Sequence, residues 1–207
     1  MLEVQLDGTL KSLAASSETR LGGKAIYRRF NAFLLKMFGS DVLGAFLKNC
    51  EKNRQDMYLL FESKMNSVRI DDDTIHMKLP TPLYEIFEEK RNVKFEVFLS
   101  RSVLGTKVQK RQTMLIIDRS IFHEMFDMAA RDIYSHVDLE QRGLKQWCVK
   151  NIIMIGVFSD SAFMQKAVRD IFYGYEFIFP KGSDLAVVKG SVQLLTDTLK
   201  VWSSYKK

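Results

Sequence analysis

Apolar residues recur at helical spacing after residue 23 and predict a first long helix. From Lys24 onward the apolar positions fall on one helical face, and Gly39 follows as a stop signal. The shared face consists of Ile26, Phe30, Phe33, Leu34 and Met37. The pattern therefore predicts a helix that packs through this face and ends before Gly39.

Residues 40–91 predict two further helices, a strand and a short helix or loop. In "SDVLGAFLKNCEK", Ser40 or Asp41 can cap the start of a helix. The apolar stripe of "NRQDMYLLFESKMNSVR" predicts the next helix and consists of Met57, Leu60, Phe61, Met65 and Val68. Apolar and polar residues alternate in "IDDDTIHMKLP", which predicts a strand. A turn bracketed by Pro80 and Pro82 follows.

Hairpins are predicted in two places. "LEVQL" and "TLKSLAA" flank Asp7-Gly8, a dipeptide that favours a two-residue hairpin turn. The β-branched and aromatic content of Asn92–Arg111 favours strands, and "VLGTKV" resembles the tip of a hairpin.

The C-terminal third has a β–α–β–α rhythm. "TMLIID" predicts a buried strand that ends at Asp118, which can cap the helix that follows. "NIIMIG" predicts a second buried strand before a helix capped by Ser159 or Asp160. "YEFIF" predicts a third strand, and a final helix runs from Ser183 towards Trp202. Apolar strands joined by helical crossovers predict a mainly parallel sheet covered on both faces.

Composition identifies a globular chain. Hydrophobic residues make up 46% of the 207 residues, and only three prolines occur. No apolar run approaches the roughly 20 residues of a membrane span, and the N-terminus lacks the pattern of a signal peptide. Cys50 and Cys148 lie far apart in the sequence and suggest no disulfide framework. These features predict a reducing, cytoplasmic location without a membrane span.

The net charge of +6 permits attraction to phosphates in general, but the basic residues are scattered. The densest group, "KVQKRQ" at Lys107–Gln112, lacks the interleaved aromatic residues of a base-stacking surface. A solvated hairpin is the favoured interpretation, and no nucleic-acid partner is expected. A nucleic-acid binder would show a steep salt dependence of binding.

Two glycine-containing turns are the candidates for ligand chemistry. Gly156 ends an apolar strand just before a helix, where a phosphate or a base could be held, but no G-x-G-x-x-G or P-loop motif occurs. Gly22 and Gly23 precede the first long helix, and paired glycines let a backbone approach a phosphate closely. Taken alone, each turn is more often structural. The three histidines show no metal-ligand spacing, and no nucleophile elbow occurs.

The order of these segments is more specific than any one of them. "SSETRLGGKAIYRRFNAFLLKMFG", "IDRSIFHEMFDMAARDIYSHVDL", "IIMIGVFSDSAFMQKAVRDIF" and "FPKGSDLAVVKGSVQ" resemble four segments of heat shock 70 kDa proteins, in family order. The details, such as "FESKMNSVRI" and "DLAVVKGSV", are closer to the divergent 12A/12B branch than to the common chaperones.

The resemblance implies an α/β chain of the actin-like ATPase (ribonuclease H-like) fold, in which ATP lies between two lobes. The sequence resembles the second lobe only. Residues 1–37 and 114–207 would form its sheet core, and residues 38–113 an inserted, mostly helical α+β outer subdomain. The family's phosphate loops, the first lobe and the substrate-binding domain have no counterpart in these residues.

The family's nucleotide-binding positions map onto this chain only in part. Gly22 and Gly23 match a glycine pair near the phosphates, and Glu62 matches a helix glutamate beside the ribose and adenine. Gly156 matches the first of two adenosine glycines. The positions that follow these matches depart from the family pattern.

Two sets of positions carry those departures. The basic positions after the helix glutamate fall at Met65 and Asn66, beside Lys64. Val157 replaces the second adenosine glycine, Phe158 could stack on a base, and Asp160 would oppose a phosphate.

We therefore expect a truncated or degenerate heat-shock-70-like protein of ATP-binding ancestry. ATP or ADP would bind weakly at most, Mg²⁺ only together with nucleotide, and ATP would not be hydrolysed by this chain as it stands. The face towards the missing lobe would be exposed and could receive a protein partner. The alternative is a binding or scaffold module that uses no nucleotide.

Overall fold

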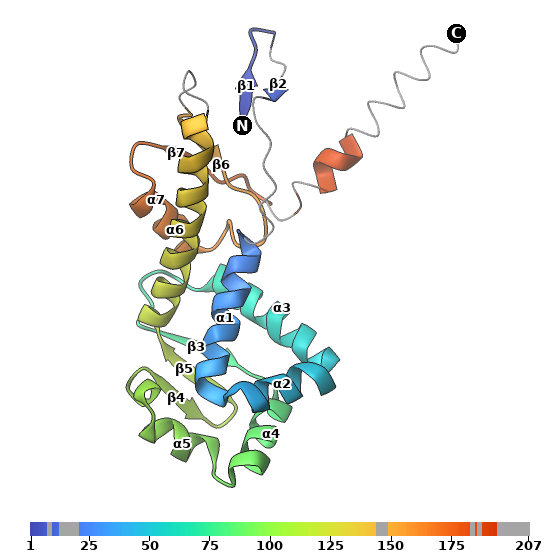
Figure 1. Cartoon of the computed structure of the whole chain (residues 1–207), viewed down its shortest axis with the longest axis vertical. Helices are drawn as coiled ribbons and strands as arrows, with labels where there is room; N and C mark the ends of the chain where they lie inside the picture. The colour runs from blue at the N-terminus through green and yellow to red at the C-terminus, as the bar shows by residue number, and fades with distance from the viewer. Residues whose placement is uncertain (8–9, 13–20, 144–148, 183–184, 186–187, 194–207) are drawn as a thin grey trace, which may run out of the picture.

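The computed structural model describes residues 1–7, 10–12, 21–143, 149–182, 185 and 188–193 and shows a mixed α/β chain (Figure 1). The described residues form three small sheets, and the long helix α6 runs along one side of the molecule. The β1–β2 hairpin lies apart from the helices. The helices are α1 (Gly23–Phe38), α2 (Ser40–Asn49), α3 (Glu51–Ser67), α4 (Thr81–Arg91), α5 (Phe95–Arg101), α6 (Arg119–Gly143) and α7 (Ala162–Ile171), with a short 3₁₀ helix η1 (Val103–Thr106). The strands are β1 (Leu2–Val4), β2 (Leu10–Ser12), β3 (Thr74–Lys78), β4 (Val108–Arg111), β5 (Met114–Asp118), β6 (Asn151–Ile153) and β7 (Glu176–Ile178).

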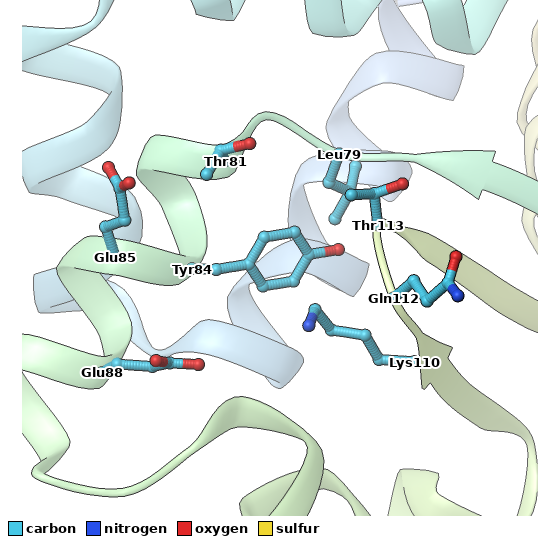
Figure 2. Close-up of a pocket in the computed structure, with 8 residues that line it drawn as sticks. All are labelled: Leu79, Thr81, Tyr84, Glu85, Glu88, Lys110, Gln112 and Thr113. Carbon is cyan, nitrogen blue, oxygen red and sulfur yellow. The ribbon is translucent and has the colours of Figure 1, made fainter.

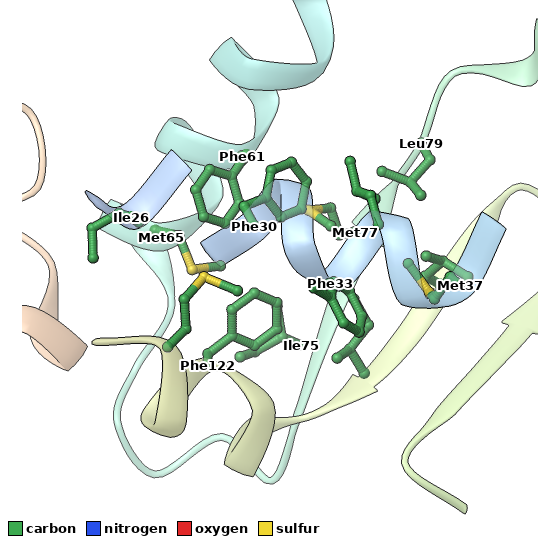
Figure 3. Packing of buried hydrophobic residues seen from close by; sticks show 14 of the residues in the cluster. Ile26, Phe30, Phe33, Met37, Phe61, Met65, Ile75, Met77, Leu79 and Phe122 are labelled. Atoms are coloured by element: carbon green, nitrogen blue, oxygen red, sulfur yellow. The ribbon is translucent and has the colours of Figure 1, made fainter. Parts of the chain in front are cut away.

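The first long helix, α1, forms where it was predicted and packs through its apolar face. All five apolar residues of its predicted face are buried. Gly39 ends the helix with a φ of 83°, a left-handed conformation that favours glycine, and its N–H donates to the Leu35 carbonyl at 2.9 Å. Phe30 of α1 stacks on Phe61 of α3 with their ring centroids 4.0 Å apart, in the centre of the core (Figure 3).

The predicted capping of α2 is wrong. Gly39 occupies the N-cap position, and no side chain of the described residues caps this helix. The Asp41 carboxylate instead accepts two hydrogen bonds from the Arg91 guanidinium of α4, at 2.6 and 2.9 Å. Asp41 thus ties two helices together rather than one helix end to itself.

The predicted stripe of α3 holds except at one residue. Met57, Phe61, Met65 and Val68 are buried, whereas Leu60 is 49% exposed. The helix packs on one side only, and Leu60 lies beside that face rather than on it.

Strand β5 lies between β3 and β4 in an antiparallel sheet of order β3-β5-β4. The alternation predicted for β3 is confirmed, because Ile75 and Met77 are buried and their neighbours are exposed. The expectation that "TMLIID" joins a parallel sheet with the C-terminal strands is wrong. The predicted boundary between residues 113 and 114 runs between two paired strands, and the division into subdomains stays a prediction.

The strand preference of residues 92–111 fails in its first half. Phe95–Arg101 forms the helix α5, which buries Phe95 and Leu99 one turn apart. The i, i+4 spacing of Phe95 and Leu99 favours a helix, whereas the aromatic content of this segment favours a strand, and the helix is what forms. The second half forms β4, which pairs with β5 as a hairpin, so the hairpin predicted around "KVQKRQ" is confirmed. Its Lys110 side chain is nevertheless mostly buried. The hairpin tip predicted at "VLGTKV" is wrong, because Val103–Thr106 forms the 3₁₀ helix η1 between α5 and β4.

The C-terminal β–α–β unit has the predicted order. Strands β6 and β7 pair in parallel and α7 connects them. Asp118 caps α6 as predicted, since its Oδ1 accepts a hydrogen bond from the Ser120 N–H at 2.8 Å. The predicted cap of α7 at Ser159 or Asp160 is wrong, because Ser161 occupies the N-cap position and its side chain forms no capping hydrogen bond. The expectation that the C-terminal sheet is covered on both faces is also wrong, because the first and last residues of β6 and of β7 are exposed.

The chain ends agree with the sequence as far as they are described. Strands β1 and β2 form the predicted antiparallel hairpin, with Val4 paired to Leu10. Five residues separate this pair, so the connection is longer than the predicted two-residue turn. Residues 188–193 are helical and Leu185 lies in a 3₁₀ turn, whereas residues 183–184, 186–187 and 194–202 of the predicted final helix lie outside the described residues.

Within the described ranges no single helix is long and apolar enough to cross a membrane. Helices α1 and α2 reach that length and hydropathy only when taken together, and they are bent by 120° at Gly39.

Candidate functional site

The structure brings three of the sequence-predicted segments together. We call the meeting place the junction; it comprises Gly22–Gly23, Glu62–Asn66 and Gly156–Asp160. A Cβ atom on Gly23 would lie 3.6 Å from Cδ2 of Phe158. The Asn66 side-chain amide donates to the Val157 carbonyl, with an N–O distance of 2.7 Å. Residues more than 90 positions apart in the sequence are therefore in direct contact.

The start of α1 supplies backbone N–H groups to the junction. Gly22 is the N-cap with a φ of 65°, and within the described residues no side chain caps this helix and no acidic residue lies in its first turn. The first N–H groups of a helix have no partner inside the helix, and they carry partial positive charge. A Cβ on Gly22 would meet no atom of the described residues within 4 Å.

The turn after β6 is held together by its own hydrogen bonds. Gly156 has a φ of 111°, a conformation that explains the glycine. The backbone N–H and the hydroxyl of Ser159 both donate to the Gly156 carbonyl, at 3.0 and 2.7 Å. The Gln165 side chain donates to the Ser159 carbonyl at 3.0 Å. Val157 does not adopt a positive φ, so the backbone conflict expected at this residue does not arise.

Phe158 belongs to the hydrophobic core and does not present its ring to solvent. Its side chain is 4% exposed. Its ring centroid lies 5.4 Å from that of Tyr27, 5.8 Å from Phe61 and 6.0 Å from Phe126. The expected stacking of Phe158 on a base is therefore not what this structure offers.

The residues of α3 divide between core and surface. Met65 is fully buried among the residues shown in Figure 3, so it lies away from any surface site. Glu62 and Asn66 are one helical turn apart and lie on the same side of α3. Burial raises the pKa of the half-buried Glu62 carboxyl. Lys64 is half-buried, and Asp160 is exposed.

The junction thus contains a helix N-terminus, the carboxylates of Glu62 and Asp160, the Lys64 ammonium and the Asn66 amide around a turn whose aromatic ring is buried. Among the described residues no three His, Cys, Asp or Glu side chains lie close enough together to hold a metal ion. This set can donate hydrogen bonds to an anion at Gly22 and Gly23.

A pocket that sequence reasoning missed lies away from the junction, between α4 and the β4–β5 turn (Figure 2). Its central residue is Tyr84, which was predicted only as part of a short helix or loop. No motif marks this pocket in the sequence, because its residues come from two segments that meet only after folding.

Comparison with known proteins shows relatives along nearly the whole chain. Human heat shock 70 kDa protein 12B is 24% identical over 191 residues, which cover 91% of this chain and 28% of the human protein. Heat shock 70 kDa protein 12A from human and from mouse is 24% identical over 189 residues, covering 90% of this chain and 28% of each relative. No family model matches the sequence, and no solved structure does.

These similarities confirm the resemblance seen in the sequence. The chain is a divergent relative of the heat shock 70 kDa proteins 12A and 12B. It spans just over a quarter of the length of these relatives. The mixed α/β architecture is consistent with the actin-like fold that this relationship implies.

Proposed function

We propose that these residues form a heat-shock-70-like lobe in which a former adenosine-contacting element has become a packed junction. In this proposal the lobe is the second lobe of an actin-like fold. Adenine nucleotides bind weakly at Gly22 and Gly23, with Mg²⁺ only as part of the nucleotide complex. These 207 residues on their own do not hydrolyse ATP.

The burial of Phe158 is the observation that carries the proposal. A base stacked on this turn needs an exposed ring, and Phe158, the residue after Val157, packs into the core instead. The hydrogen bond from Asn66 to the Val157 carbonyl holds α3 against the turn. Both contacts replace ligand contacts with protein contacts, which supports weak rather than tight nucleotide binding.

The lack of hydrolysis follows from what phosphoryl transfer requires. Catalysis depends on positioning Mg²⁺, the phosphates and the attacking water within fractions of an ångström. The junction supplies a helix N-terminus, and the sequence contains no P-loop to position the phosphates and Mg²⁺.

An assay of ATP turnover with Mg²⁺ tests this proposal. We expect no activity above that of buffer, for the native chain and for Gly23→Ala alike. Gly23→Ala is a suitable control because its Cβ would make only ordinary van der Waals contacts, at 3.6 Å or more. Magnesium-dependent turnover that Gly23→Ala abolishes would contradict the proposal.

A second candidate function is a protein-binding module that uses no nucleotide. The outward face of the β6–β7 sheet favours it, because Ile153 is 62% exposed, Ile155 50% and Ile178 48%. Neighbouring exposed apolar side chains mark interaction surfaces. The partner would be a protein with a complementary apolar face, including a second copy of this chain.

Sedimentation of the purified chain tests the second candidate. We expect self-association that Ile153→Lys weakens. Leu59→Lys is the matched control, because Leu59 is also 62% exposed but lies on α3. A stable monomer at high micromolar concentration that binds no hydrophobic dye would show that the exposed face of the β6–β7 sheet does not mediate self-association.

A further inference from the structure

The pocket between α4 and the β4–β5 turn has a volume of about 200 Å³. Figure 2 shows Tyr84 at its centre, with two glutamates on one side and the residues of the β4–β5 turn on the other. Its lining consists of Leu79, Thr81, Tyr84, Glu85, Glu88, Lys110, Gln112 and Thr113. The volume equals roughly six to seven water molecules at about 30 Å³ each, so it suits a ligand smaller than a typical drug.

The Tyr84 hydroxyl group has no hydrogen-bond partner in the part of the chain that the structure describes. The residue is only 7% exposed. Nearly all buried polar atoms in proteins are paired, so an unpaired one indicates a missing partner. In Figure 2 the hydroxyl points towards the Thr113 side of the pocket. Burial raises the pKa of Tyr84, and the negative charge of Glu96 raises it further. The hydroxyl therefore stays protonated and can donate a hydrogen bond.

Lys110 adds a second donor beside Tyr84. Its ammonium pairs with the Glu96 carboxylate and lies 4.9 Å from the centroid of the Tyr84 ring. The Lys110 side chain is only 11% exposed. An ammonium carries three hydrogens, and the single bond to Glu96 leaves donors for an acceptor in the pocket. One side of the pocket therefore calls for a carboxylate or carbonyl oxygen.

The opposite side of the pocket is acidic. Glu88 accepts hydrogen bonds from Lys94 at 2.6 Å and from the Phe95 N–H at 3.3 Å, which fix its carboxylate. Glu85 is exposed and forms no ion pair with a described residue. Because Lys94 already pairs with Glu88, Glu85 is the carboxylate on this side that calls for a positively charged group. The two sides together call for a ligand with both charges.

We propose that this pocket binds a small zwitterion of the amino-acid class. The carboxylate of the ligand accepts from the Tyr84 hydroxyl and from Lys110, and its ammonium lies near Glu85 and Glu88. The apolar wall of Leu79 and the Tyr84 ring covers the methylene groups between them. This site is independent of the junction and of nucleotide binding.

A protein-observed NMR titration with the ω-amino acids from glycine to 6-aminohexanoate tests the proposal. The separation of the two charges grows by one methylene along this series, so one length should bind best. We expect saturable shifts at the pocket residues, and none with the N-acetyl derivative or the primary amide of the best ligand. Saturable binding of these derivatives with equal affinity, or no binding by any member at about 10 mM, overturns the proposal.

Three variants locate the binding in this pocket. Tyr84→Phe removes only the unpaired hydroxyl and should weaken binding about tenfold to a hundredfold. Tyr58→Phe is the matched control: its hydroxyl donates to Asn31 at 2.8 Å outside the pocket, so binding should not change. Glu85→Gln should weaken binding a few-fold, as an exposed ion pair does.

The outcome is decisive even if one variant does not fold. Native affinity in a folded Tyr84→Phe protein overturns the proposal. If that variant does not fold, Glu85→Gln carries the test, because an exposed side chain without a described ion pair is not needed for folding. Unchanged affinity in Glu85→Gln then overturns the proposal.

Discussion

At the junction and at the Tyr84 pocket, segments that are separate in the sequence meet around a buried aromatic side chain. The two places differ in whether the neighbouring residues meet all the packing and hydrogen-bonding needs of that side chain. Phe158 at the junction is entirely apolar, so three neighbouring rings complete its environment. Tyr84 is equally buried but carries a hydroxyl that no described residue pairs. The resemblance to a known family led to the junction, where protein contacts cover the aromatic ring. The Tyr84 pocket, in contrast, has no motif in the sequence, and its hydroxyl is left unpaired by the described residues.

Removal of the Phe158 ring should have the largest effect on stability. Phe158→Ala creates a cavity at the meeting point of α1, α3 and α6, and we expect a loss of about 3–5 kcal/mol in the free energy of unfolding. Urea denaturation measures it. Tyr173→Ala is the control, since Tyr173 is 97% exposed and its loss should change stability by less than about 0.5 kcal/mol. A loss below about 1 kcal/mol for Phe158→Ala would mean that the ring is not part of the core.

Removal of a tyrosine hydroxyl should have opposite effects at two positions. Tyr84→Phe removes an unpaired buried hydroxyl and should leave stability unchanged or raise it by about 1 kcal/mol. Tyr58→Phe breaks the hydrogen bond to Asn31 and should cost about 1 kcal/mol. Thermal unfolding of the two variants measures the difference. Equal losses would show that the Tyr84 hydroxyl has a partner in solution.

Loss of the Asn66 amide tests how firmly α3 holds the turn after β6. Asn66→Ala removes the hydrogen bond to the Val157 carbonyl, and we expect a net loss of about 0.5–1 kcal/mol. Ser63→Ala in the same helix is the control. Its free energy of unfolding should rise by about 0.5 kcal/mol or less, because alanine has a better helix propensity than serine. Urea denaturation of both proteins measures the effect. A gain for Asn66→Ala equal to that of Ser63→Ala would show that the bond contributes nothing.

Acid should weaken the tie between α2 and α4, the helix that carries Tyr84, and this is the smallest expected effect. The hydrogen bonds from Arg91 lower the pKa of Asp41 to about 2. Because the folded pKa is lowered, the stabilisation is complete above the unfolded pKa of about 3.9 and is lost as the pH falls towards 2. Denaturation between pH 5 and pH 2 measures it, with Asp41→Asn as the reference. A constant difference between the two proteins over this range would contradict the assignment.

The helices could be predicted because the residues of an apolar helical face lie three or four positions apart in the sequence. Ile26 and Met37 lie eleven residues apart and were placed on one face from the sequence alone. Caps were predicted less well, since Asp41 has the right chemistry for a cap but finds a stronger partner in Arg91. That partner lies 50 residues away, and only the fold brings it near.

Strand partners and the filling of the site could not be predicted from local patterns. The apolar run of β5 suits a parallel sheet as well as the antiparallel sheet that it joins, because its pattern does not encode its neighbours. The site could be predicted only in part. The glycines Gly22 and Gly156 indicated where segments meet, but the orientation of Phe158 could not be predicted. Whether Phe158 faces inwards or outwards depends on three rings from three other helical positions.

Calorimetric titration of the purified chain with ATP and Mg²⁺ tests the central claim most directly. If protein contacts have replaced the ligand contacts at the junction, the titration should show a dissociation constant of about 1 mM or weaker, a binding free energy of roughly 4 kcal/mol or less. A dissociation constant in the micromolar range, roughly 8 kcal/mol, would show that the junction is a working nucleotide site.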